Sequence, residues 1–488
     1  MRTSKLLSYI HGRSCAILGL GVSNLPLAQV LCDAGIPLTV YDKKSVGALG
    51  DAAQDLAARG VRFVCGADAF AEIGEALIFR SPGIRPDLSG LVRAQARGSE
   101  LCSEIELLLL LGEAETFGIT GSDGKTTTTT LTGKFLETQK AREGIGRVFV
   151  GGNIGTPLLT RCDDMTEDDC AVLELSSFQL MTADACVRHA AITNLTPNHL
   201  DWHTDMDEYE RAKRHIVGKE TVRFVTNAEN AVTARIAREE IARAAREVIL
   251  FSSTRTQYED FSDFATDGKP FGAIYERDGV IRYSDGHSEQ ILLKTEHIRV
   301  PGRHNVENFM TAMGLTLGEV DVSVYESVAK EFSGVEHRLE WVRTLDGVDY
   351  YNGSIDSSPT RTAAALSALQ GRDIVVICGG YDKKIAFEPL AESLCHAARA
   401  VVLTGATGEK IRACIEACAQ YDRENLQIVS EPIFADAVAA ARALARDGGC
   451  VLLSPACASF DAFRNFAERG NAFKTIVKSF SSAKDTKN

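Results

Sequence analysis

The sequence lacks any apolar run long enough to cross a membrane. The densest run, IELLLLL at residues 105–111, falls far short of the roughly 20 residues that a membrane helix needs, and it predicts a buried helix instead. No charged-then-apolar export signal opens the chain either, because MRTSKLLSYIHGRS becomes polar again at once. We therefore expect a cytoplasmic protein with no membrane partner.

Cysteine pairs at metal or redox spacing and an excess of basic residues are also lacking. The 13 cysteines include no CxxC pair and have no nearby histidine at zinc spacing, which predicts small buried thiols in a reducing compartment. Lysine and arginine number 53 against 66 aspartates and glutamates, for a formal net charge of -13. With no basic stripe, nucleic acid is not an expected partner.

What remains is an ordinary globular composition. Of the 488 residues, 45% are hydrophobic and 24% are charged. This length allows about three domains at roughly 150 residues each. Along the chain, apolar strands alternate with helical stretches, so we expect an α/β protein.

The first hundred residues predict a βαβ unit that suits a nucleotide. The predicted elements are a strand at 14–21, a helix at 23–35 and a strand at 37–42. Gly19 and Gly21 would let the backbone approach a diphosphate, and Asp42 is spaced to contact a ribose or base. Asn24 replaces the third glycine of the dinucleotide fingerprint, so a tight turn without a ligand explains the pattern about as well. A second turn at 80–86 would lie at the same sheet edge.

The middle of the chain opens with a predicted phosphate loop. ETFGIT predicts a strand, GSDGK a loop and TTTTTLTGKFLET a helix, which is the order that a phosphate cradle needs. The strict pattern fails at Ile119, which stands in place of its first glycine. Loop N–H groups would hold phosphate oxygens, Lys125 would neutralise their charge, and the Thr126 hydroxyl would bind Mg²⁺.

The five threonines after Lys125 have more than one role. Thr126 and Thr127 lie in the first helical turn, where hydroxyls and unpaired N–H groups point at a ligand. For Thr128, Thr129 and Thr130 we expect packing against the sheet and no catalytic role.

Further polar residues follow apolar strands of this segment. Glu174, His199 and Asp201 each come after such a strand, so we expect them at one sheet edge beside the phosphate loop, in the layout of a metal site. Each alone is more often structural.

Beyond them, two alternating runs around Asp278-Gly279 predict a hairpin with a type I′ turn. Asn305 and Asn308 are one turn apart and could meet an adenine edge, although helix capping explains Asn305 equally well.

The chain from about Val335 alternates again and predicts a second doubly wound domain. Polar residues and glycines follow its strands, at Gly379-Gly380, Lys383, Ser454 and Ser459. These loops would present their side chains at the carboxyl edge of the sheet, where ligands bind in such folds.

The residues at these places resemble the Mur ligase family. The motifs that carry the resemblance occur in the family's order over nearly the whole chain: GITGSDGKTT, LELSSFQL, NLTPNHLDWH, EYERAKRHI, PGRHNVENFMTA, VEHRLEWV, ICGGYDKKIAFEPL and LSPACASFDAFRNFAERGNAFK. The glycine-rich start and the serine-alanine-cysteine stretch are similar to the branch that adds D-glutamate. The resemblance implies a Rossmann-like UDP-binding domain (1–103), a central P-loop ATPase domain with a parallel sheet (104–334) and a Rossmann-like amino-acid-binding domain (335–488).

The resemblance also implies roles for individual residues. Contacts to the UDP-sugar substrate are implied for Ser23, Asp42, Lys43, Gly83 and Asn153. Contacts to ATP are implied for Gly121, Ser122, Asp123, Gly124, Lys125, Thr126, Thr127, Asn308 and, with His337, Arg338. Two Mg²⁺ ions would be bound by Thr126, Glu174, His199 and a carbamylated Lys213, and Lys125, His199 and Lys213 would be catalytic. The D-glutamate site would be shaped by Ser357, Lys383, Ser459 and Phe466.

The implied activity is ATP-dependent addition of D-glutamate to UDP-N-acetylmuramoyl-L-alanine by a monomer, in peptidoglycan precursor synthesis.

Two positions depart from the family. Gly353 stands where many members carry an aspartate for the ATP ribose, so either ATP is held less tightly or another group, such as Asp356, substitutes. Asp123 stands where asparagine is frequent, and a carboxylate near phosphates is repulsive unless it points away or pairs with a cation.

Two alternatives stay open at this point. The chain could add another amino acid, such as L-alanine, a diamino acid or glutamate on folate, although folate ligases would lack the first domain. It could also be a catalytically impaired binding protein, for which Gly353 is the one hint.

Overall fold

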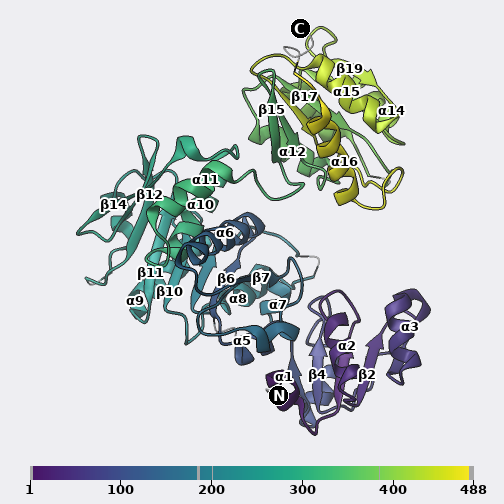
Figure 1. Cartoon of the computed structure of the whole chain (residues 1–488), viewed down its shortest axis with the longest axis vertical. Helices are drawn as coiled ribbons and strands as arrows, with labels where there is room; N and C mark the ends of the chain where they lie inside the picture. The colour runs from purple at the N-terminus through teal and green to yellow at the C-terminus, as the bar shows by residue number, and fades with distance from the viewer. Residues whose placement is uncertain (1–3, 184–186, 201, 267, 384, 483–488) are drawn as a thin grey trace. The chain divides into compact units, whose positions relative to one another are not determined.

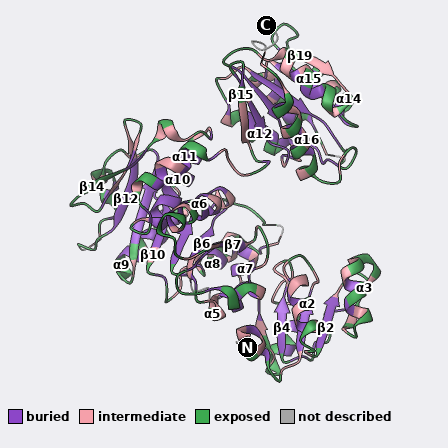
Figure 2. Ribbon diagram, in the orientation of Figure 1, coloured by how far each residue is buried: buried purple, intermediate pink, exposed green. Residues whose placement is uncertain are grey.

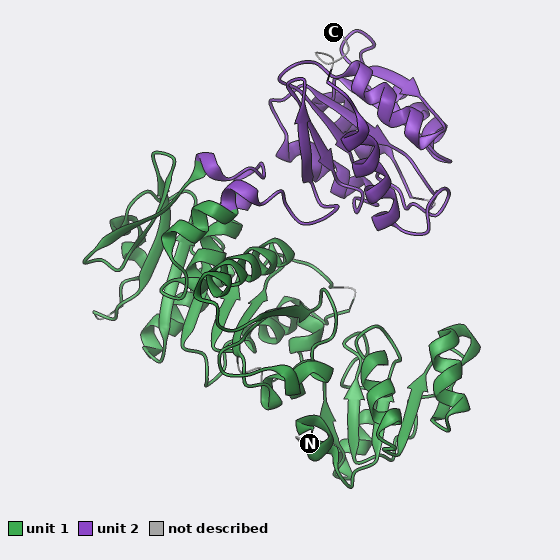
Figure 3. Cartoon of the chain, in the orientation of Figure 1, with its two compact units in different colours: residues 1–295, 306–328 green, residues 296–305, 329–488 purple. Residues whose placement is uncertain are grey.

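A computed structural model describes residues 4–183, 187–200, 202–266, 268–383 and 385–482. The chain forms two compact units, residues 1–295 with 306–328 and residues 296–305 with 329–488 (Figure 3). Three sheets build them (Figure 1), and each lies within one of the three domain ranges expected from the sequence. The α/β prediction is confirmed.

The first sheet is wholly parallel, with the strand order β3-β2-β1-β4-β5. Its elements are α1 (Lys5–Ile10), β1 (Cys15–Leu18), α2 (Leu25–Asp33), β2 (Leu38–Asp42), η1 (Gly47–Leu49), α3 (Asp51–Ala58), β3 (Arg62–Cys65), β4 (Leu77–Arg80), α4 (Ser89–Ala96) and β5 (Glu100–Cys102). The order reverses between β1 and β4, so the loops after these two strands meet at a switch point, the usual ligand position in such sheets. Gly19 shows how closely they meet, because a Cβ there would lie 3.0 Å from Ser81 Cβ.

The second sheet has the strand order β14-β13-β12-β11-β10-β9-β6-β8-β7 and is parallel except for the antiparallel pairs β12–β13 and β13–β14. Its strands are β6 (Glu115–Thr120), β7 (Val148–Gly152), β8 (Cys170–Glu174), β9 (His189–Ile192), β10 (Arg223–Asn227), β11 (Glu247–Ser252), β12 (Gly272–Arg277), β13 (Val280–Ser284) and β14 (Glu289–Lys294). Its helices are α5 (Glu104–Leu111), α6 (Lys125–Glu143), η2 (Leu159–Asp164), α7 (Ser177–Leu180), α8 (Met206–Arg214), α9 (Ala231–Arg243), η3 (Tyr258–Phe264) and η4 (Thr295–His297).

Two helices follow this sheet in the chain, α10 (Arg303–Thr316) and α11 (Val322–Glu331). The predicted hairpin is confirmed at β12–β13, where Asp278 and Gly279 have φ angles of 54° and 74°. Positive φ at both turn residues is what a type I′ turn requires.

The third sheet has the order β15-β16-β20-β17-β18-β19, and only the β15–β16 pair is antiparallel. Its elements are β15 (Glu340–Leu345), β16 (Val348–Asn352), α12 (Pro359–Ala368), β17 (Ile374–Cys378), α13 (Glu388–Ala397), β18 (Ala400–Leu403), α14 (Gly408–Glu416), β19 (Gln427–Ser430), α15 (Phe434–Leu444), β20 (Cys450–Leu453) and α16 (Phe466–Ser479). The second doubly wound domain expected from the sequence is therefore present.

The central strands of all three sheets are buried, as Figure 2 shows in purple. They read as continuous apolar runs because helices cover parallel sheets on both faces. The expectation for residues 105–111 is only partly right, since Ile105, Leu107 and Leu108 are buried but Leu110 is 64% exposed. Within the described ranges, no helix is both long and apolar enough to span a bilayer.

Candidate functional site

The loop between β6 and α6 is closed by residues that follow β9 and by a residue of α10. Gly121 and Gly124 have φ angles of 147° and 81°, and a Cβ at either position would overlap the side chain of Thr193 or Asn308, respectively. Thr193 Oγ1 also donates to Asp123 O at 2.6 Å. Glycine is therefore required at both loop positions, for conformation and for space.

The N–H and hydroxyl groups of Ser122 fix the rest of the loop. Ser122 N donates to Asn194 O at 2.9 Å, and Ser122 Oγ donates to Thr196 O at 2.9 Å and contacts Tyr209 Oη at 3.0 Å. Asp123 N donates to Asn194 Oδ1 at 3.0 Å, while the Asp123 side chain is exposed. The loop is thus held by backbone groups and hydroxyls, and the unusual carboxylate at 123 takes no part in closing it.

Two lysines meet at one carbonyl of this loop. Lys125 Nζ donates to Gly121 O and Ser122 O, both at 2.9 Å. Lys213 Nζ, from α8, donates to the same Gly121 O at 2.8 Å and to Thr120 Oγ1 at 3.2 Å. Lys213 is only 2% exposed. Burial, and then the neighbouring Lys125 charge, hold the pKa of Lys213 well below its usual range.

Glu174 ends β8 next to β6, and its side chain is also buried. Its Oε1 accepts a hydrogen bond from Asn153 Nδ2 at 2.8 Å. Its Oε2 is buried and has no hydrogen-bond partner among the described residues. A buried carboxylate oxygen without a partner is costly unless a cation binds it.

His199 lies beyond β9, in the loop that leads to α8. Its backbone has a φ of 56°, which non-glycine residues rarely adopt, and its ring packs edge-on to Phe178 with the centroids 5.0 Å apart. Phe178 belongs to α7, which begins shortly after Glu174. Asp201, expected beside these residues, lies outside the described residues. In the described part of the chain, no cluster of three or more His, Cys, Asp or Glu side chains could hold a metal ion.

The packing expected for Thr128 to Thr130 is only partly right, because Thr130 is half-buried and its hydroxyl donates to Thr126 O at 2.8 Å. The ligand role of Thr126 and Thr127 stays a prediction. Thr126 and Thr127 are in the first turn of α6, and Thr128 and Thr129 are fully buried. Thr128 Oγ1 hydrogen-bonds to Asn308 Oδ1 at 3.3 Å, whereas Thr129 Oγ1 is buried with no hydrogen-bond partner in the part of the chain that is described. Asn308 therefore lies against the start of α6.

Of the other residues expected at ATP, Asn305 donates to Pro301 O at 2.6 Å, a local bond at the start of α10. Arg338 is exposed in the other unit.

The residues expected at the UDP moiety follow the strands of the first sheet. Asp42 ends β2, where its Oδ2 accepts from Leu20 N at 3.0 Å and its Oδ1 from Lys44 N at 2.9 Å. The carboxylate thus ties the glycine turn after β1 to the end of β2. Lys43 and Gly83 are exposed and Ser23 is half-buried beside this turn.

Two arginines near this edge were missed by sequence reasoning. The Arg80 guanidinium is buried and donates to Ile84 O at 2.6 Å and to Phe178 O at 3.1 Å. Arg85 forms an ion pair with Glu208 of α8 at 3.0 Å. Both residues stand in the RSPGIRP turn and have local partners, but each also contacts a residue distant in sequence, Phe178 for Arg80 and Glu208 for Arg85, which gives no local signal.

In the other unit, the four residues expected at the D-glutamate site all follow strands of the third sheet or lie at the start of α16. Lys383 Nζ donates to Ser357 O at 3.2 Å. Tyr381 N donates to Ala458 O at 2.9 Å, which ties the loop after β17 to the loop that carries the buried Ser459. Phe466 is 40% exposed.

Arg469 organises this edge and was also missed. Its buried guanidinium donates to Ala458 O and Cys457 O at 3.1 Å and to Ser354 O at 2.8 Å. Ser354 Oγ in turn donates to Phe466 O at 2.7 Å. Burial lowers the pKa of Arg469 to about 10. One side chain therefore joins the loops that carry Ser459 and Phe466.

Gly353 and Asp356 are in direct contact. A Cβ at Gly353 would lie 2.5 Å from Asp356 Oδ2 and 2.8 Å from Leu453 O. Asp356 is buried, accepts from Ser454 Oγ at 2.9 Å, and has its pKa raised by burial to about 7. A larger residue at 353 therefore does not fit while the Asp356 carboxyl occupies this place.

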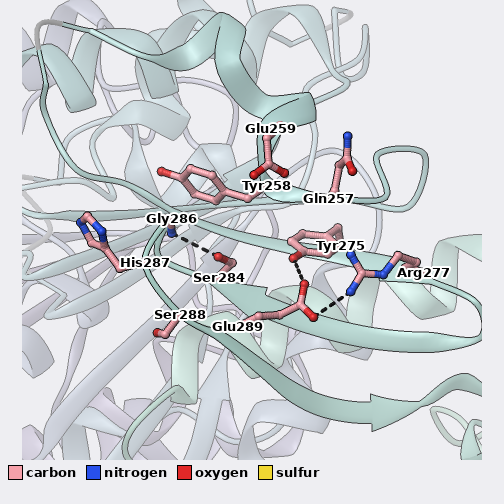
Figure 4. Close-up of a pocket in the computed structure, with 10 residues that line it drawn as sticks. All are labelled: Gln257, Tyr258, Glu259, Tyr275, Arg277, Ser284, Gly286, His287, Ser288 and Glu289. Carbon is pink, nitrogen blue, oxygen red and sulfur yellow. Dashed lines mark hydrogen bonds and ion pairs between the residues drawn. The ribbon is translucent and has the colours of Figure 1, made fainter.

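A separate polar cavity of about 280 Å³ lies between η3 and the β12–β14 strands (Figure 4). Glu289, one of the two carboxylates that line it, is already bonded to Tyr275, to Arg277 at 2.7 Å and to Arg282 at 2.8 Å. In the strand order β14 lies at the opposite end of the sheet from β7, and five strands separate it from β6. The cavity therefore belongs to a different part of the unit from the phosphate loop.

Comparison with known proteins matches most of the chain. The family described as "Mur ligase middle domain" matches residues 119–316, and "Mur ligase, glutamate ligase domain" matches residues 337–457. The UDP-N-acetylmuramoylalanine–D-glutamate ligase of Ruminiclostridium cellulolyticum is 40% identical over 473 residues, covering 96% of this chain and 97% of that protein. Its counterpart in Clostridium perfringens is 39% identical over 472 residues, with the same coverage.

Solved structures show the same fold at low sequence identity. UDP-N-acetylmuramate-alanine ligase from Thermotoga maritima matches with a TM-score of 0.52 and 17% identity, over 96% of this chain and 99% of that one. A UDP-N-acetylmuramoyl-L-alanyl-D-glutamate–2,6-diaminopimelate ligase matches with a TM-score of 0.55 and 15% identity, over 84% and 93%.

Proposed function

The chain belongs to the Mur ligase family and is an ATP-dependent ligase of its D-glutamate-adding branch, and we propose that the phosphate loop, Glu174 and Lys213 form the centre of its reaction. The substrates are UDP-N-acetylmuramoyl-L-alanine, ATP and D-glutamate. The observation that carries the proposal is that Lys125 and Lys213 both donate to Gly121 O, while Glu174, at the end of the adjacent strand β8, has a buried Oε2 with no hydrogen-bond partner among the described residues.

The chemistry follows from what an amide bond requires. A carboxylate is a poor electrophile, so the terminal alanine carboxylate must first take the γ-phosphoryl group of ATP and become an acyl phosphate. The amine of D-glutamate then attacks the acyl carbon, and inorganic phosphate leaves. The first step brings two anions together, and catalysis therefore depends on positioned positive charge.

The phosphate loop supplies that positioning. Helix α6 begins at Lys125 directly after this loop, and the backbone N–H groups and dipole of its first turn favour anions. Lys125 would exchange its carbonyl partners for the β and γ phosphates, and the Thr126 and Thr127 hydroxyls would contact the phosphates or their metal. Asn308, fixed beside Gly124, would bind the base, and Arg338 is proposed as a further ATP contact.

The side chains present fit a magnesium site. Glu174 offers a carboxylate oxygen, Thr126 a hydroxyl and His199 an imidazole, and oxygen donors suit a hard cation. Mg²⁺ bound here would offset the repulsion between the two reacting anions. The buried Glu174 Oε2 is the observation that supports this fit.

Lys213 fits the site as a carbamate. An ammonium beside Lys125 and a metal would be repelled by both, and burial already disfavours it. A neutral amine can add CO₂ and lose a proton, and the resulting carbamate is anionic and offers oxygen ligands. Its contacts with Thr120 Oγ1 and Gly121 O, at the start of the phosphate loop, support this role.

The substrate sites are proposed at the sheet edges described above. Ser23, Asp42, Lys43 and Gly83 would hold the UDP moiety, with Asn153 toward the sugar. The D-glutamate site would consist of Ser357, Lys383, Ser459 and Phe466. The links through Lys383 and Arg469 support this second assignment, because they bring the loops that carry all four residues together.

We also propose that the enzyme works as a monomer in the cytoplasm, where its nucleotide substrates are made. Both the phosphate loop and the amino-acid loops are on one chain, so no second copy is needed to supply them. Light scattering on the purified protein should give the mass of one chain, and a dimer mass would contradict the proposal.

The proposed reaction is tested by phosphate release. The purified enzyme should release phosphate from ATP only when UDP-N-acetylmuramoyl-L-alanine and D-glutamate are both present, and a panel of amino acids reports its specificity. Lys125→Ala is the matched inactive control. Equal turnover with L-alanine or L-lysine would contradict the assignment.

A further inference from the structure

The RSPGIRP turn of the first sheet holds the segment between β9 and α8 in place. Arg85 of this turn donates to Trp202 O at 2.7 Å and to the two carboxylate oxygens of Glu208 at 3.0 and 3.2 Å. Glu208 lies in the first turn of α8. Trp202 Nε1 in turn donates to Gly83 O at 3.3 Å. The turn and the segment are therefore joined by hydrogen bonds that run in both directions.

The same contacts reach the side chain and the backbone of His199. The Arg85 guanidinium lies over the Trp202 ring, 5.0 Å from its centroid, and the Phe178 ring packs edge-on to Trp202 with the centroids 4.6 Å apart. Phe178 also packs edge-on to the His199 ring at 5.0 Å. On the backbone, Trp202 N donates to His199 O at 3.1 Å, next to the positive φ of His199. A displaced Trp202 would therefore shift both the ring and the main chain of His199.

Phe178 is held from a second side. Arg80, the first residue of the RSPGIRP turn, donates to Phe178 O at 3.1 Å. The His203 ring stacks on the Phe178 ring with the centroids 5.6 Å apart, and its Nε2 lies 2.9 Å from Ser177 Oγ. Helix α7, which contains Ser177 and Phe178, lies beside α8 (Figure 1). One turn of the first sheet therefore contacts both helices.

We propose that Arg85 is a positioning residue of the ligase reaction. Through Trp202 it sets the place of His199. Through Glu208 it sets the first turn of α8, the helix that carries Lys213. The inference rests on the proposed centre, where His199 and Lys213 bind the metal. Groups that hold a metal ligand in its coordinating orientation contribute to metal affinity, although they do not touch the ion.

The turn also belongs to the proposed UDP site, which gives the link a role in the reaction. Gly83 precedes Arg85 in the turn and is proposed to contact the UDP moiety. The UDP-sugar carries the carboxylate that accepts the phosphoryl group, and ATP at the metal site donates it. Because Arg85 joins the two sites, it fixes the distance between the reacting groups, and small displacements of such groups are costly in rate.

The test compares the full-length enzyme with Arg85→Gln, which removes the charge and the ion pair. Mn²⁺ is the probe of the metal site, and its dissociation constant is measured by electron paramagnetic resonance at a fixed concentration of a non-hydrolysable ATP analogue. Phosphate release gives kcat and the KM for D-glutamate, and urea unfolding confirms that each variant is folded. Asp87→Asn is the matched control. Asp87 contacts the same guanidinium at 2.8 Å but belongs to the first domain, so its replacement leaves the contacts to Trp202 and Glu208 in place.

Arg85→Gln should weaken Mn²⁺ binding and lower kcat, each by about ten- to a hundredfold. The KM for D-glutamate should not change, because its proposed site belongs to the other unit. Arg85→Lys keeps the charge but not the planar two-bond contact, so it should recover only part of the loss. Asp87→Asn should match the parent in all three quantities. An ion pair that served stability alone would lower the urea midpoint and leave the Mn²⁺ dissociation constant and kcat of the folded enzyme unchanged.

His199→Ala separates this inference from the proposed centre on which it rests. If His199→Ala binds Mn²⁺ as tightly as the parent, the metal centre itself is wrong and the inference falls with it. If His199→Ala loses Mn²⁺ affinity while Arg85→Gln keeps the parental affinity and kcat, the centre stands and the positioning role of Arg85 is refuted. Equal losses in Arg85→Gln and Asp87→Asn would also refute that role, because the contacts to Trp202 and Glu208 would then not be the cause.

Discussion

Replacing Thr129 by valine should stabilise the enzyme without harming its activity. Thr129 is fully buried in α6, and its Oγ1 has no hydrogen-bond partner among the described residues. Valine has nearly the same shape and replaces the hydroxyl by a methyl group. The change therefore removes a buried polar atom and opens no cavity.

The magnitude follows from the burial of that one atom. A buried donor or acceptor without a partner costs about 1–3 kcal/mol, and threonine and valine have similar helix propensities. We expect Thr129→Val to raise the free energy of unfolding by about 1–2 kcal/mol. Thr128→Val is the matched control, since it lies one position earlier, is equally buried, and would lose the hydrogen bond to Asn308.

The assay is urea unfolding followed by circular dichroism, together with phosphate release in the ligase reaction. Thr129→Val should unfold at a higher urea concentration than the parent and Thr128→Val at a lower one, with turnover retained in Thr129→Val. If Thr129→Val were the less stable variant, or as inactive as Lys125→Ala, the division of the threonine run into ligand-binding and packing residues would be wrong.

Three further predictions concern charge. Lys125→Ala should lower turnover by about a hundredfold or more, because one positioned charge at a transferring phosphoryl group is worth about 3 kcal/mol. The phosphate-release assay measures this turnover, and a value near that of the parent would refute the role assigned to Lys125. Burial gives Asp356 a folded-state pKa of about 7, which is above its unfolded value. Its ionisation therefore lowers the free energy of unfolding as the pH rises from about 4 to 7. In unfolding titrations, Asp356→Asn should be more stable than the parent at pH 8 and lose that advantage near pH 4, and an advantage independent of pH would contradict this. The ion pair with Arg85 lowers the pKa of Glu208 to about 2. It therefore adds stability above pH 4.5, and this stability is lost as the pH falls toward 2. Glu208→Gln should be less stable than the parent at neutral pH and lose less unfolding free energy on acidification, and parallel plots of stability against pH for the two proteins would contradict this.

The parts of the site predicted from sequence are those with a local cause. Residues 115–143 contain a strand, a glycine loop, a lysine and the start of a helix in that order. This local order predicts a phosphate loop whatever the fold of the rest of the chain. Glu174 could be placed at the same edge because parallel strands end on the same side of a sheet. The fold class followed for a similar reason, from strands and helices that alternate along the chain.

The parts that were missed depend on distant segments meeting. Arg80, Arg85 and Arg469 are single arginines, each with one partner far along the chain, at Phe178 O, Glu208 and Ser354 O respectively, and no spacing marks them. The crowding of Asp356 against Gly353 is similar, since it depends on where Leu453 ends its strand. The exposure of Leu110 could not be predicted either, because a continuous apolar run does not indicate which side of its helix faces solvent.

The most direct test of the proposed centre is the activity of Lys213→Ala with and without added formate. If Lys213 acts as a carbamate, the variant should lose nearly all phosphate release and recover part of it when formate supplies a carboxylate in the vacated space. Lys125→Ala, assayed in parallel, should gain nothing from formate. A Lys213→Ala enzyme with full activity and no response to formate would contradict the account of this site.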